Sequence, residues 1–205
     1  TRVAGNGFEE NDEVGVFALV GSSTMKEERY ADNLRFFRTS EKVFESSEPI
    51  YYPDDEVTLR LISYYPYQEE GVNMGESTMS VAVETDQNLS AGYFCSDFLV
   101  ASQNLQSAPK GAIALHYDHK FFKLKIALVG KEGEELQGIL DADPKLSVCG
   151  FYTKAIYDFQ KETYSAFSNE KSITPAGKWE IQGDRLSGKE VILIPQETTL
   201  GYQYI

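Results

Sequence analysis

Hydrophobic and polar positions along the chain follow the two-residue alternation that is typical of half-buried β-strands. The clearest case is residues 122–128, in which apolar side chains at the even positions alternate with Lys123, Lys125 and Ala127. Residues 57–64 alternate in the same way and end at the Tyr-Tyr-Pro-Tyr of residues 64–67, because proline cannot continue a central strand. Residues 14–20 form an unbroken apolar run instead, which predicts a buried strand.

Shorter segments with strand-like patterns recur along the rest of the chain. We predict strands at residues 34–38, 42–46, 79–83, 113–117, 121–129, 146–152 and 191–194, with smaller pieces at 173 and 179–181. The short connection after residue 117 predicts a β-hairpin formed by residues 113–117 and 121–129. Residues 26–31 have room for one helical turn, but no segment longer than about 12 residues keeps a helical period. Strands spaced in this way predict an all-β, antiparallel β-sandwich architecture.

A polar break at residues 130–134, Gly-Lys-Glu-Gly-Glu, predicts the boundary between two domains. The N-terminal β-sandwich domain then spans residues 1–130, and the C-terminal domain spans residues 131–205.

Composition narrows the choice of partners and compartments. The chain has 205 residues, 41% of them hydrophobic, so it can bury a core, and its 13 Tyr and 12 Phe favour strands. A net charge of -13 excludes nucleic acid as a partner, because binding to phosphates needs a basic face. No apolar run approaches the roughly 20 residues of a membrane span, and no signal peptide opens the chain. A cytosolic protein, a mature secreted protein and a chain cut after its signal remain open.

Residues that could carry chemistry are few. The two histidines, His116 and His119, are three apart on a predicted strand and would point to opposite faces, so we predict no metal site and no cofactor. For Cys95 and Cys149 a disulfide is one alternative, and two buried free thiols are the interpretation that we favour. The acidic clusters at residues 54–56 and 141–143 are typical of turns rather than of calcium loops.

Enzyme classes find no support in the sequence. It contains no Gly-x-Ser-x-Gly elbow and no glycine-rich loop between a strand and a helix, so we predict that the protein is not an enzyme. Tyr64, Tyr65 and Tyr67 are candidate ligand-facing aromatic residues that could stack on a sugar. The alternative is that these rings pack within the sandwich.

Several short motifs together resemble one known family. They are, in order, the opening Thr1-Arg2-Val3, the Tyr-Tyr-Pro-Tyr of residues 64–67, the Ser-Asp-Phe-Leu-x-Ala of residues 96–101, His116, the Lys-Leu-Lys-Ile of residues 123–126, Val148-x-Gly150, Trp179, and the Ile-Pro-Gln of residues 194–196. Each motif is weak alone, but their order and spacing resemble the fimbrillin-like (Mfa-like, FimA-like) proteins of Bacteroidales-type Gram-negative anaerobes. Members of this family are surface pilus subunits and related lipoproteins.

The resemblance implies two transthyretin-like antiparallel β-sandwich domains in a protein exported as a lipoprotein to the outer membrane and the fimbrium. It also implies that an arginine-specific protease removes a first strand and leaves a groove, which the terminal strand of another subunit fills. The implied partners are therefore other pilus subunits, by strand addition, and a host or bacterial surface receptor. The expected function is a structural pilus subunit that polymerises by donor-strand exchange and supports adhesion. The alternative is a non-polymerising tip or anchor adhesin that binds glycan or protein.

Arg2 is the position that resembles the cleavage arginine of the family. The alternative is that Arg2 only marks the edge of the chain, and Arg29 and Arg35 are further candidates for processing. Family members usually continue for several more strands after the Pro-Gln motif, whereas this chain stops at Ile205. The second sandwich is therefore expected to be either truncated or unusually short.

Overall fold

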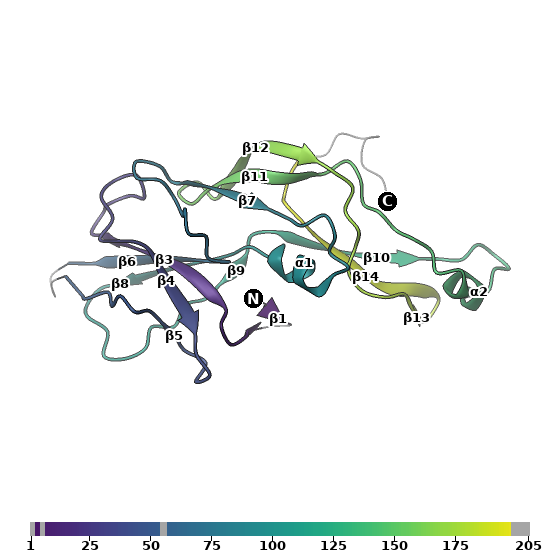
Figure 1. Ribbon diagram of the computed structural model, residues 1–205, viewed down its shortest axis with the longest axis horizontal. Helices are drawn as coiled ribbons and strands as arrows, with labels where there is room; N and C mark the ends of the chain where they lie inside the picture. The colour runs from purple at the N-terminus through teal and green to yellow at the C-terminus, as the bar shows by residue number, and fades with distance from the viewer. Residues whose placement is uncertain (1–2, 5–6, 54–56, 198–205) are drawn as a thin grey trace. The chain divides into compact units, whose positions relative to one another are not determined.

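Figure 1 shows the computed structural model of the chain, which describes residues 3–4, 7–53 and 57–197. The described residues form several antiparallel sheets and two short helices, α1 (Ser90–Cys95) and α2 (Leu136–Asp141). The predicted all-β class is therefore confirmed. With six residues each, neither of these helices approaches the length and apolar character needed to cross a membrane.

The chain divides into two units, each assembled from three segments. Unit 1 comprises Thr1–Val81, Asp97–Lys120 and Ile156–Ala166, and unit 2 comprises Ala82–Ser96, Phe121–Ala155 and Phe167–Ile205. This division differs from a single cut after residue 130, because the chain returns to unit 1 late in the sequence. A polar break marks a place where the chain can turn, but it does not show which distant strands belong together.

The largest sheet lies in unit 1 and has six antiparallel strands in the order β5-β4-β3-β6-β8-β9 (Figure 1). Its strands are β3 (Glu13–Val20), β4 (Ala31–Arg38), β5 (Phe44–Glu45), β6 (Leu59–Tyr65), β8 (Leu99–Leu105) and β9 (Asp118–His119). A separate two-stranded hairpin, β1 (Val3–Ala4) and β2 (Gly7–Phe8), precedes them. At the centre of the sheet, Val16 lies opposite Leu34 of β4 and Ser63 of β6.

Strand β3 is buried on both faces, as its unbroken apolar run predicts. On one face the Phe17 ring stacks on Tyr64, with the ring centroids 5.8 Å apart, and meets Phe159 edge-on at 6.1 Å. On the other face Val14 and Val16 form a second cluster with Tyr65 and neighbouring apolar side chains. A large apolar side chain contributes about 1.5–3 kcal/mol on full burial, so packing on both faces makes β3 the centre of the unit 1 core.

A three-stranded sheet has the order β12-β11-β7, formed by β7 (Thr78–Ala82), β11 (Tyr152–Asp158) and β12 (Thr163–Glu170). Within unit 1, the rings of Tyr157 and Phe159 at the end of β11 pack against Phe98, with Phe98 and Tyr157 5.1 Å apart. The same Phe159 ring contacts Phe17 and Tyr64 of the six-stranded sheet. Unit 1 is therefore a β-sandwich with an aromatic interior.

Unit 2 contains a three-stranded antiparallel sheet in the order β10-β14-β13, formed by β10 (Phe122–Leu128), β13 (Glu180–Gln182) and β14 (Arg185–Leu193). The end of β14 is its most buried part, because Val191 and Leu193 are completely inaccessible to solvent. The equally inaccessible Gln87 side chain accepts a bond from the Ile192 amide (2.8 Å) and donates one to the Ile192 carbonyl (2.8 Å). The Gln87 side chain thus satisfies both backbone groups of Ile192, as a neighbouring strand would do.

Three local predictions are wrong. Residues 146–152 do not form a strand, because Val148 makes only an isolated bridge with Ile173 and β11 begins at Tyr152. Residues 113–117 form no strand, and the predicted hairpin is absent: β10 pairs instead with β14, so that Leu124 lies opposite Val191. Residues 26–30 form no helical turn, and Ala31 already belongs to β4. In each case a local pattern predicted an element that the segment does not form, because pairing and packing with distant segments decide its conformation.

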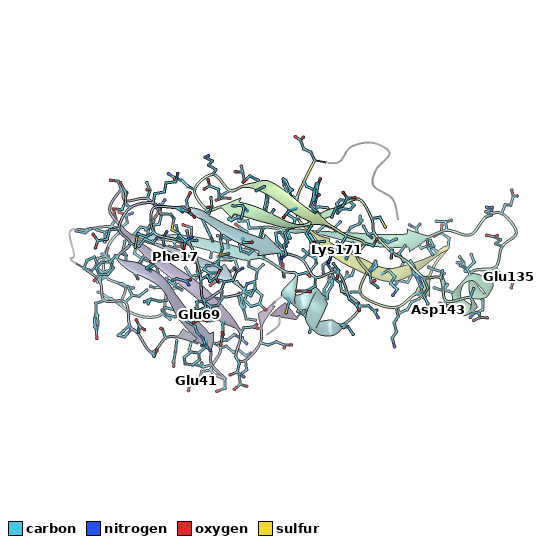
Figure 2. All side chains as sticks on the ribbon, turned by 45° about the horizontal axis from the view of Figure 1, so that its top comes forward. Phe17, Glu41, Glu69, Glu135, Asp143 and Lys171 are labelled. Atoms are coloured by element: carbon cyan, nitrogen blue, oxygen red, sulfur yellow. The ribbon has the colours of Figure 1, made fainter. Side chains whose placement is uncertain are left out.

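Charged side chains gather on the surface, as Figure 2 shows for examples from both units. The labelled acidic residues Glu41, Glu69, Glu135 and Asp143 are exposed, whereas Phe17 is completely buried.

Candidate functional site

The main candidate site is a groove of about 780 Å³ in unit 1. Its floor is apolar and comes from four adjacent strands of the six-stranded sheet: Val14 and Val16 of β3, Phe36 of β4, Leu59 and Leu61 of β6, and Leu105 of β8. These side chains point to one face because residues two apart on a strand share a face. The groove therefore follows from the same alternation that predicts the strands.

Three further segments complete the lining of the groove. One segment is residues 42–52, and another is residues 109–117; both contribute side chains to the lining. The third contribution is Phe8 of β2. The Phe8 ring meets Phe44 and Tyr117 edge-on, with centroids 5.0 Å apart in both pairs, and Tyr65 at 5.5 Å. This aromatic contact joins the N-terminal hairpin to the groove.

Residues 109–117 form no strand and include a bend at residues 110–111. At the end of this segment the Tyr117 hydroxyl lies 2.6 Å from the Ser63 hydroxyl, which itself donates to the Gly15 carbonyl at 3.0 Å. Because the single hydroxyl proton of Ser63 goes to Gly15, Tyr117 is the donor to Ser63. Burial raises the pKa of Tyr117 to about 12. This short chain of hydrogen bonds ties residues 109–117 to the sheet.

The two edges of the six-stranded sheet are only partly covered. Strand β5 pairs with Phe37 and Arg38 of β4, and β9 pairs with Leu99 and Val100 of β8. Within the described ranges, no strand pairs with the outer side of β4 before Phe37 or of β8 after Val100. Unpaired edges of this kind accept an added strand, and the apolar floor beside them can bury its side chains.

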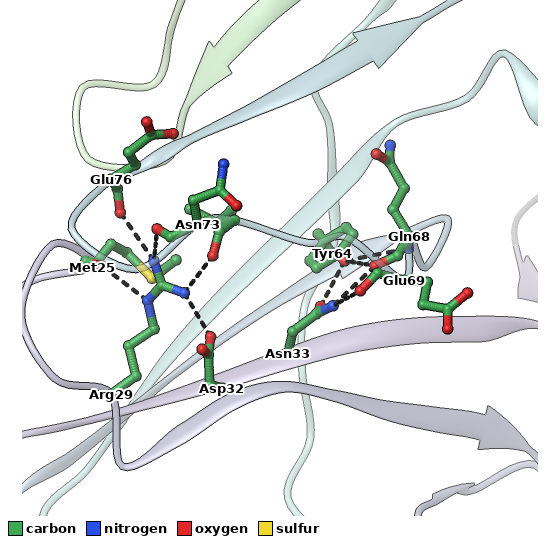
Figure 3. A network of polar contacts seen from close by, with 10 residues as sticks. Met25, Arg29, Asp32, Asn33, Tyr64, Gln68, Glu69, Asn73 and Glu76 are labelled. Atoms are coloured by element: carbon green, nitrogen blue, oxygen red, sulfur yellow. Dashed lines mark hydrogen bonds and ion pairs between the residues drawn. The ribbon is translucent and has the colours of Figure 1, made fainter.

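The candidate processing arginines have different surroundings. Arg2 lies outside the described residues. Arg29 is buried: its guanidinium donates to the carbonyls of Met25, Val72, Asn73 and Glu76 at 2.6–3.0 Å and pairs with Asp32 at 2.5 Å (Figure 3). Arg29 therefore holds two loops together and is inaccessible to a protease in the folded chain. Arg35 is exposed and pairs with Glu13.

The three candidate ligand-facing tyrosines do not form a surface patch. Tyr64 and Tyr65 are completely buried, so the prediction is wrong for both, because neighbouring residues of β6 point to opposite faces and both faces are covered. The Tyr64 hydroxyl donates to the Asn33 side chain at 2.7 Å (Figure 3), and this burial raises the pKa of Tyr64. Tyr67 is half-buried, with the Arg35 guanidinium 6.0 Å from its ring centroid.

The histidines and cysteines are dispersed. His119 lies 2.9 Å from the Asp97 carboxylate, and His116 is exposed. Among the residues that the structure describes, no group of three His, Cys, Asp or Glu side chains is placed to hold a metal ion. Both cysteines are free thiols, as we favoured, but neither is buried as we expected: Cys95 is exposed and Cys149 is half-buried.

The arrangement in the groove is suited to binding rather than to covalent chemistry. Sequence reasoning missed residues 109–117 as groove lining, although their apolar run Ala-Ile-Ala-Leu was the available signal. That run was interpreted as a strand because pattern alone cannot separate a strand from an extended segment that lies on a sheet face.

Two solved structures from Bacteroides species have a fold similar to that of this chain. A structure from Bacteroides uniformis, described as a candidate cell adhesion protein, has 20% identity and a TM-score of 0.65, and the match covers 95% of this chain and 72% of that one. A second, from Bacteroides ovatus and described in the same way, has 14% identity and a TM-score of 0.64, with 97% and 73% covered.

Comparisons by sequence were made with individual curated proteins and with protein families. None of the curated proteins compared with this chain matches it. The family described as fimbrillin-like matches residues 1–205, which is the whole chain given. With its antiparallel sandwich, its apolar groove and this match over every residue, the chain belongs to the fimbrillin-like family.

Proposed function

We propose that this protein is a structural subunit of a cell-surface pilus that polymerises by donor-strand exchange and supports cell adhesion. The observation that carries the proposal is the apolar groove of about 780 Å³ beside the partly uncovered edges of β4 and β8. Membership of the fimbrillin-like family supports a structural, non-enzymatic role at the cell surface.

Strand addition explains how such a groove would hold a partner. An extended strand offers its backbone groups to an uncovered sheet edge and places every second side chain, about 6.6–6.8 Å apart, over the apolar floor. Each large apolar side chain buried in this way contributes about 1.5–3 kcal/mol. Because the groove of one subunit takes a strand from another, the contact is head-to-tail and repeats into an open filament.

Processing at Arg2 and lipid anchoring are part of the same proposal. Arg2 directly precedes β1, and the Phe8 ring at the end of the β1-β2 hairpin contributes to the groove. A cut after Arg2 would therefore separate everything before Val3 from the hairpin that contacts the groove. Mass spectrometry of filament-bound protein tests this step: a mature chain that begins at Val3 is expected, and an intact Arg2-Val3 bond in filaments contradicts it.

The experiment that tests polymerisation uses filaments sheared from the native cells. An antibody against this chain is expected to show a ladder of multimers before boiling and one monomer band afterwards, because strand-exchanged contacts resist detergent until heated. A single band in the sheared fraction before boiling favours the alternative, a tip or anchor adhesin that binds glycan or protein. Absence of the protein from that fraction contradicts the pilus proposal.

A further inference from the structure

A second, smaller hollow in unit 1 differs from the groove in chemistry. It has a volume of about 280 Å³, and every residue that lines it is polar or glycine: Gly21, Ser22, Ser23, Thr58, Arg60, Asn104 and Gln106. None of them lines the apolar groove. The hollow is therefore a separate feature with a separate capacity for binding.

The topology of the sheet brings these residues together. Strands β3, β6 and β8 are adjacent and antiparallel. The last residues of β3, the first of β6 and the last of β8 therefore lie next to one another, at the same end of the sheet. Arg60 lies directly opposite Asn104 in the β6-β8 pair, and the Gly21 amide donates to the Thr58 carbonyl at 2.8 Å. Leu59 and Leu61 of β6 face the groove. Because Arg60 lies between them on the strand, its side chain projects from the opposite face of the sheet.

The polar groups of the hollow have unused hydrogen-bonding capacity. The Arg60 guanidinium donates one long bond, 3.3 Å, to the Ser23 carbonyl. Within the described part of the chain, its remaining N–H groups have no partner, and neither do the side chains of Ser22, Asn104 and Gln106. A guanidinium, two side-chain amides and hydroxyl groups thus converge on one space without satisfying one another.

The charge of the hollow contrasts with that of the chain. The sequence has 32 Asp and Glu against 19 Lys and Arg, yet among the described residues no Asp or Glu lines the hollow and Arg60 does. A guanidinium binds a carboxylate through two parallel N–H···O bonds, and amide side chains donate to and accept from hydroxyl groups. The lining lacks any aromatic or large apolar side chain, so an apolar ligand does not fit it.

We propose that this hollow binds an acidic sugar unit of a glycan, with the sugar carboxylate on Arg60 and its hydroxyl groups on Asn104, Gln106 and Ser22. The volume lies below the range of about 300–1,000 Å³ that is usual for drug-sized ligands, so it suits one sugar ring. The site gives the subunit an adhesive surface of its own, on a different face from the groove, and it does not depend on polymerisation.

The test uses the monomeric protein and sodium glucuronate as the probe, with glucose and acetate as matched ligands. Titration followed by ligand-observed NMR is expected to show saturable binding of glucuronate that is stronger than binding of either glucose or acetate. Arg60→Gln is expected to weaken glucuronate binding by at least about tenfold, because a charge-assisted pair of hydrogen bonds is lost. Asn104→Ala, at an exposed position, is expected to weaken it by about threefold to tenfold.

Controls separate a lost site from a lost fold. Arg185→Gln removes an exposed arginine of unit 2 and is expected to leave glucuronate binding unchanged. Three acidic residues, Asp54, Asp55 and Glu56, precede Thr58 in the sequence and lie outside the described residues. Because salt screens the effect of such charges on an anionic probe, each titration is repeated at two salt concentrations. Glucuronate that does not bind, that binds no better than glucose or acetate, or that binds equally well to folded Arg60→Gln or Asn104→Ala overturns the proposal. None of these results depends on whether the protein forms filaments.

Discussion

Arg29 carries more hydrogen bonds than any other side chain discussed above, and its guanidinium is completely buried. It satisfies four backbone carbonyls that belong to two loops, at residues 25 and 72–76, and it pairs with Asp32. A buried charge with this many partners stabilises a fold mainly because removing it leaves its partners unsatisfied.

We therefore expect Arg29→Met to lower the free energy of unfolding by about 3–5 kcal/mol, measured by urea denaturation. Arg185→Met is the matched control: Arg185 is exposed, and among the described residues its ion pair is with Asp184, so a change below about 0.5 kcal/mol is expected. Equal destabilisation by the two variants would contradict the structural role of Arg29.

Removing the hydroxyl group is expected to have opposite effects on stability at Tyr157 and at Tyr64, although both rings are buried. In the part of the chain described, the Tyr157 hydroxyl is the buried side-chain atom that has no hydrogen-bond partner, whereas the Tyr64 hydroxyl donates to Asn33. Tyr157→Phe is expected to leave the free energy of unfolding unchanged or to raise it by up to about 1 kcal/mol, because it removes an unsatisfied group. Tyr64→Phe is expected to lower it by about 1 kcal/mol. Thermal and urea denaturation of the two variants measure these changes. A larger loss of unfolding free energy in Tyr157→Phe than in Tyr64→Phe would contradict the prediction and show that the Tyr157 hydroxyl has a hydrogen-bond partner.

Asp158 makes the stability of the protein sensitive to acid. Burial alone raises its pKa, but hydrogen bonds from the Gln160 amide (2.8 Å), the Ser77 hydroxyl (2.9 Å) and the Lys161 amide (3.2 Å) outweigh burial, so the pKa lies below its ordinary value. A lowered pKa in the folded state stabilises the fold above the unfolded value of about 3.9 and ceases to do so as the pH falls below it.

Asp158→Asn is therefore expected to lose stability at pH 7 and to show a smaller further loss than the wild type between pH 5 and pH 2.5. Urea denaturation of both proteins at these pH values measures the difference. An identical pH dependence in the two proteins would show that Asp158 does not contribute.

At the scale of elements, β14 and the segment just before β13 approach each other closely at two glycines, Gly188 and Gly177. A Cβ at Gly188 would lie 2.1 Å from the Lys178 carbonyl oxygen, and a Cβ at Gly177 would lie 1.9 Å from the Gly188 carbonyl oxygen. Both distances are far below van der Waals contact, and both glycines have positive φ, 103° for Gly188 and 87° for Gly177. Only glycine permits this approach of the two backbones.

Gly188→Ala is therefore expected to lower the free energy of unfolding by more than about 2 kcal/mol, from backbone strain and from the contact with the carbonyl. Gly183→Ala is the control for φ alone, because Gly183 also has positive φ (65°) but its Cβ meets no atom within 4 Å; a loss of about 1 kcal/mol is expected. Similar losses in both variants, measured by urea denaturation, would show that the close approach is unimportant.

Prediction of elements from the sequence succeeded where the pattern was strong. Strands β3 and β6 lie within two residues of their predicted bounds, because their apolar runs face covered surfaces. Strand β8 was missed because its second half, Ser-Gln-Asn, is exposed and polar, and β12 was missed because most of its residues are exposed. Strands that keep few buried residues carry little periodic signal.

At the scale of the whole molecule, the groove makes the proposed polymerisation testable by substitution. Ile113 lines the groove and is 37% exposed, so a charge there disturbs the floor without entering the core. Ile113→Asp is expected to leave the unfolding transition of the monomer nearly unchanged but to remove the multimer ladder from sheared filaments, because a carboxylate cannot be buried beneath an added strand.

Met74→Asp is the matched control, since Met74 is exposed and lies outside the lining of the groove. The ladder is expected to persist in this variant. Ladders of equal strength in both variants would exclude the groove as the acceptor of the strand.

The candidate sites show the limit of sequence reasoning most clearly. The groove floor was implicit in the alternation of β3 and β6, but residues 109–117, which complete its lining, were predicted to be a hairpin strand. Tyr64 and Tyr65 were predicted to face a ligand, although an alternating strand with both faces covered buries each of two adjacent residues. The polar hollow could not be predicted, because its residues come from strands that are distant in sequence and adjacent only in the sheet.

Three properties could be predicted without the structure: the chain is all-β, β3 is buried on both faces, and the surface is acidic. These properties follow from composition and from a two-residue period that is read within one strand. The strand partners and the groove lining became known from the folded arrangement, in which β10 pairs with β14 rather than with residues 113–117. The physical reason is that alternation specifies the faces of a strand locally, whereas pairing is selected by packing between segments that lie far apart along the chain.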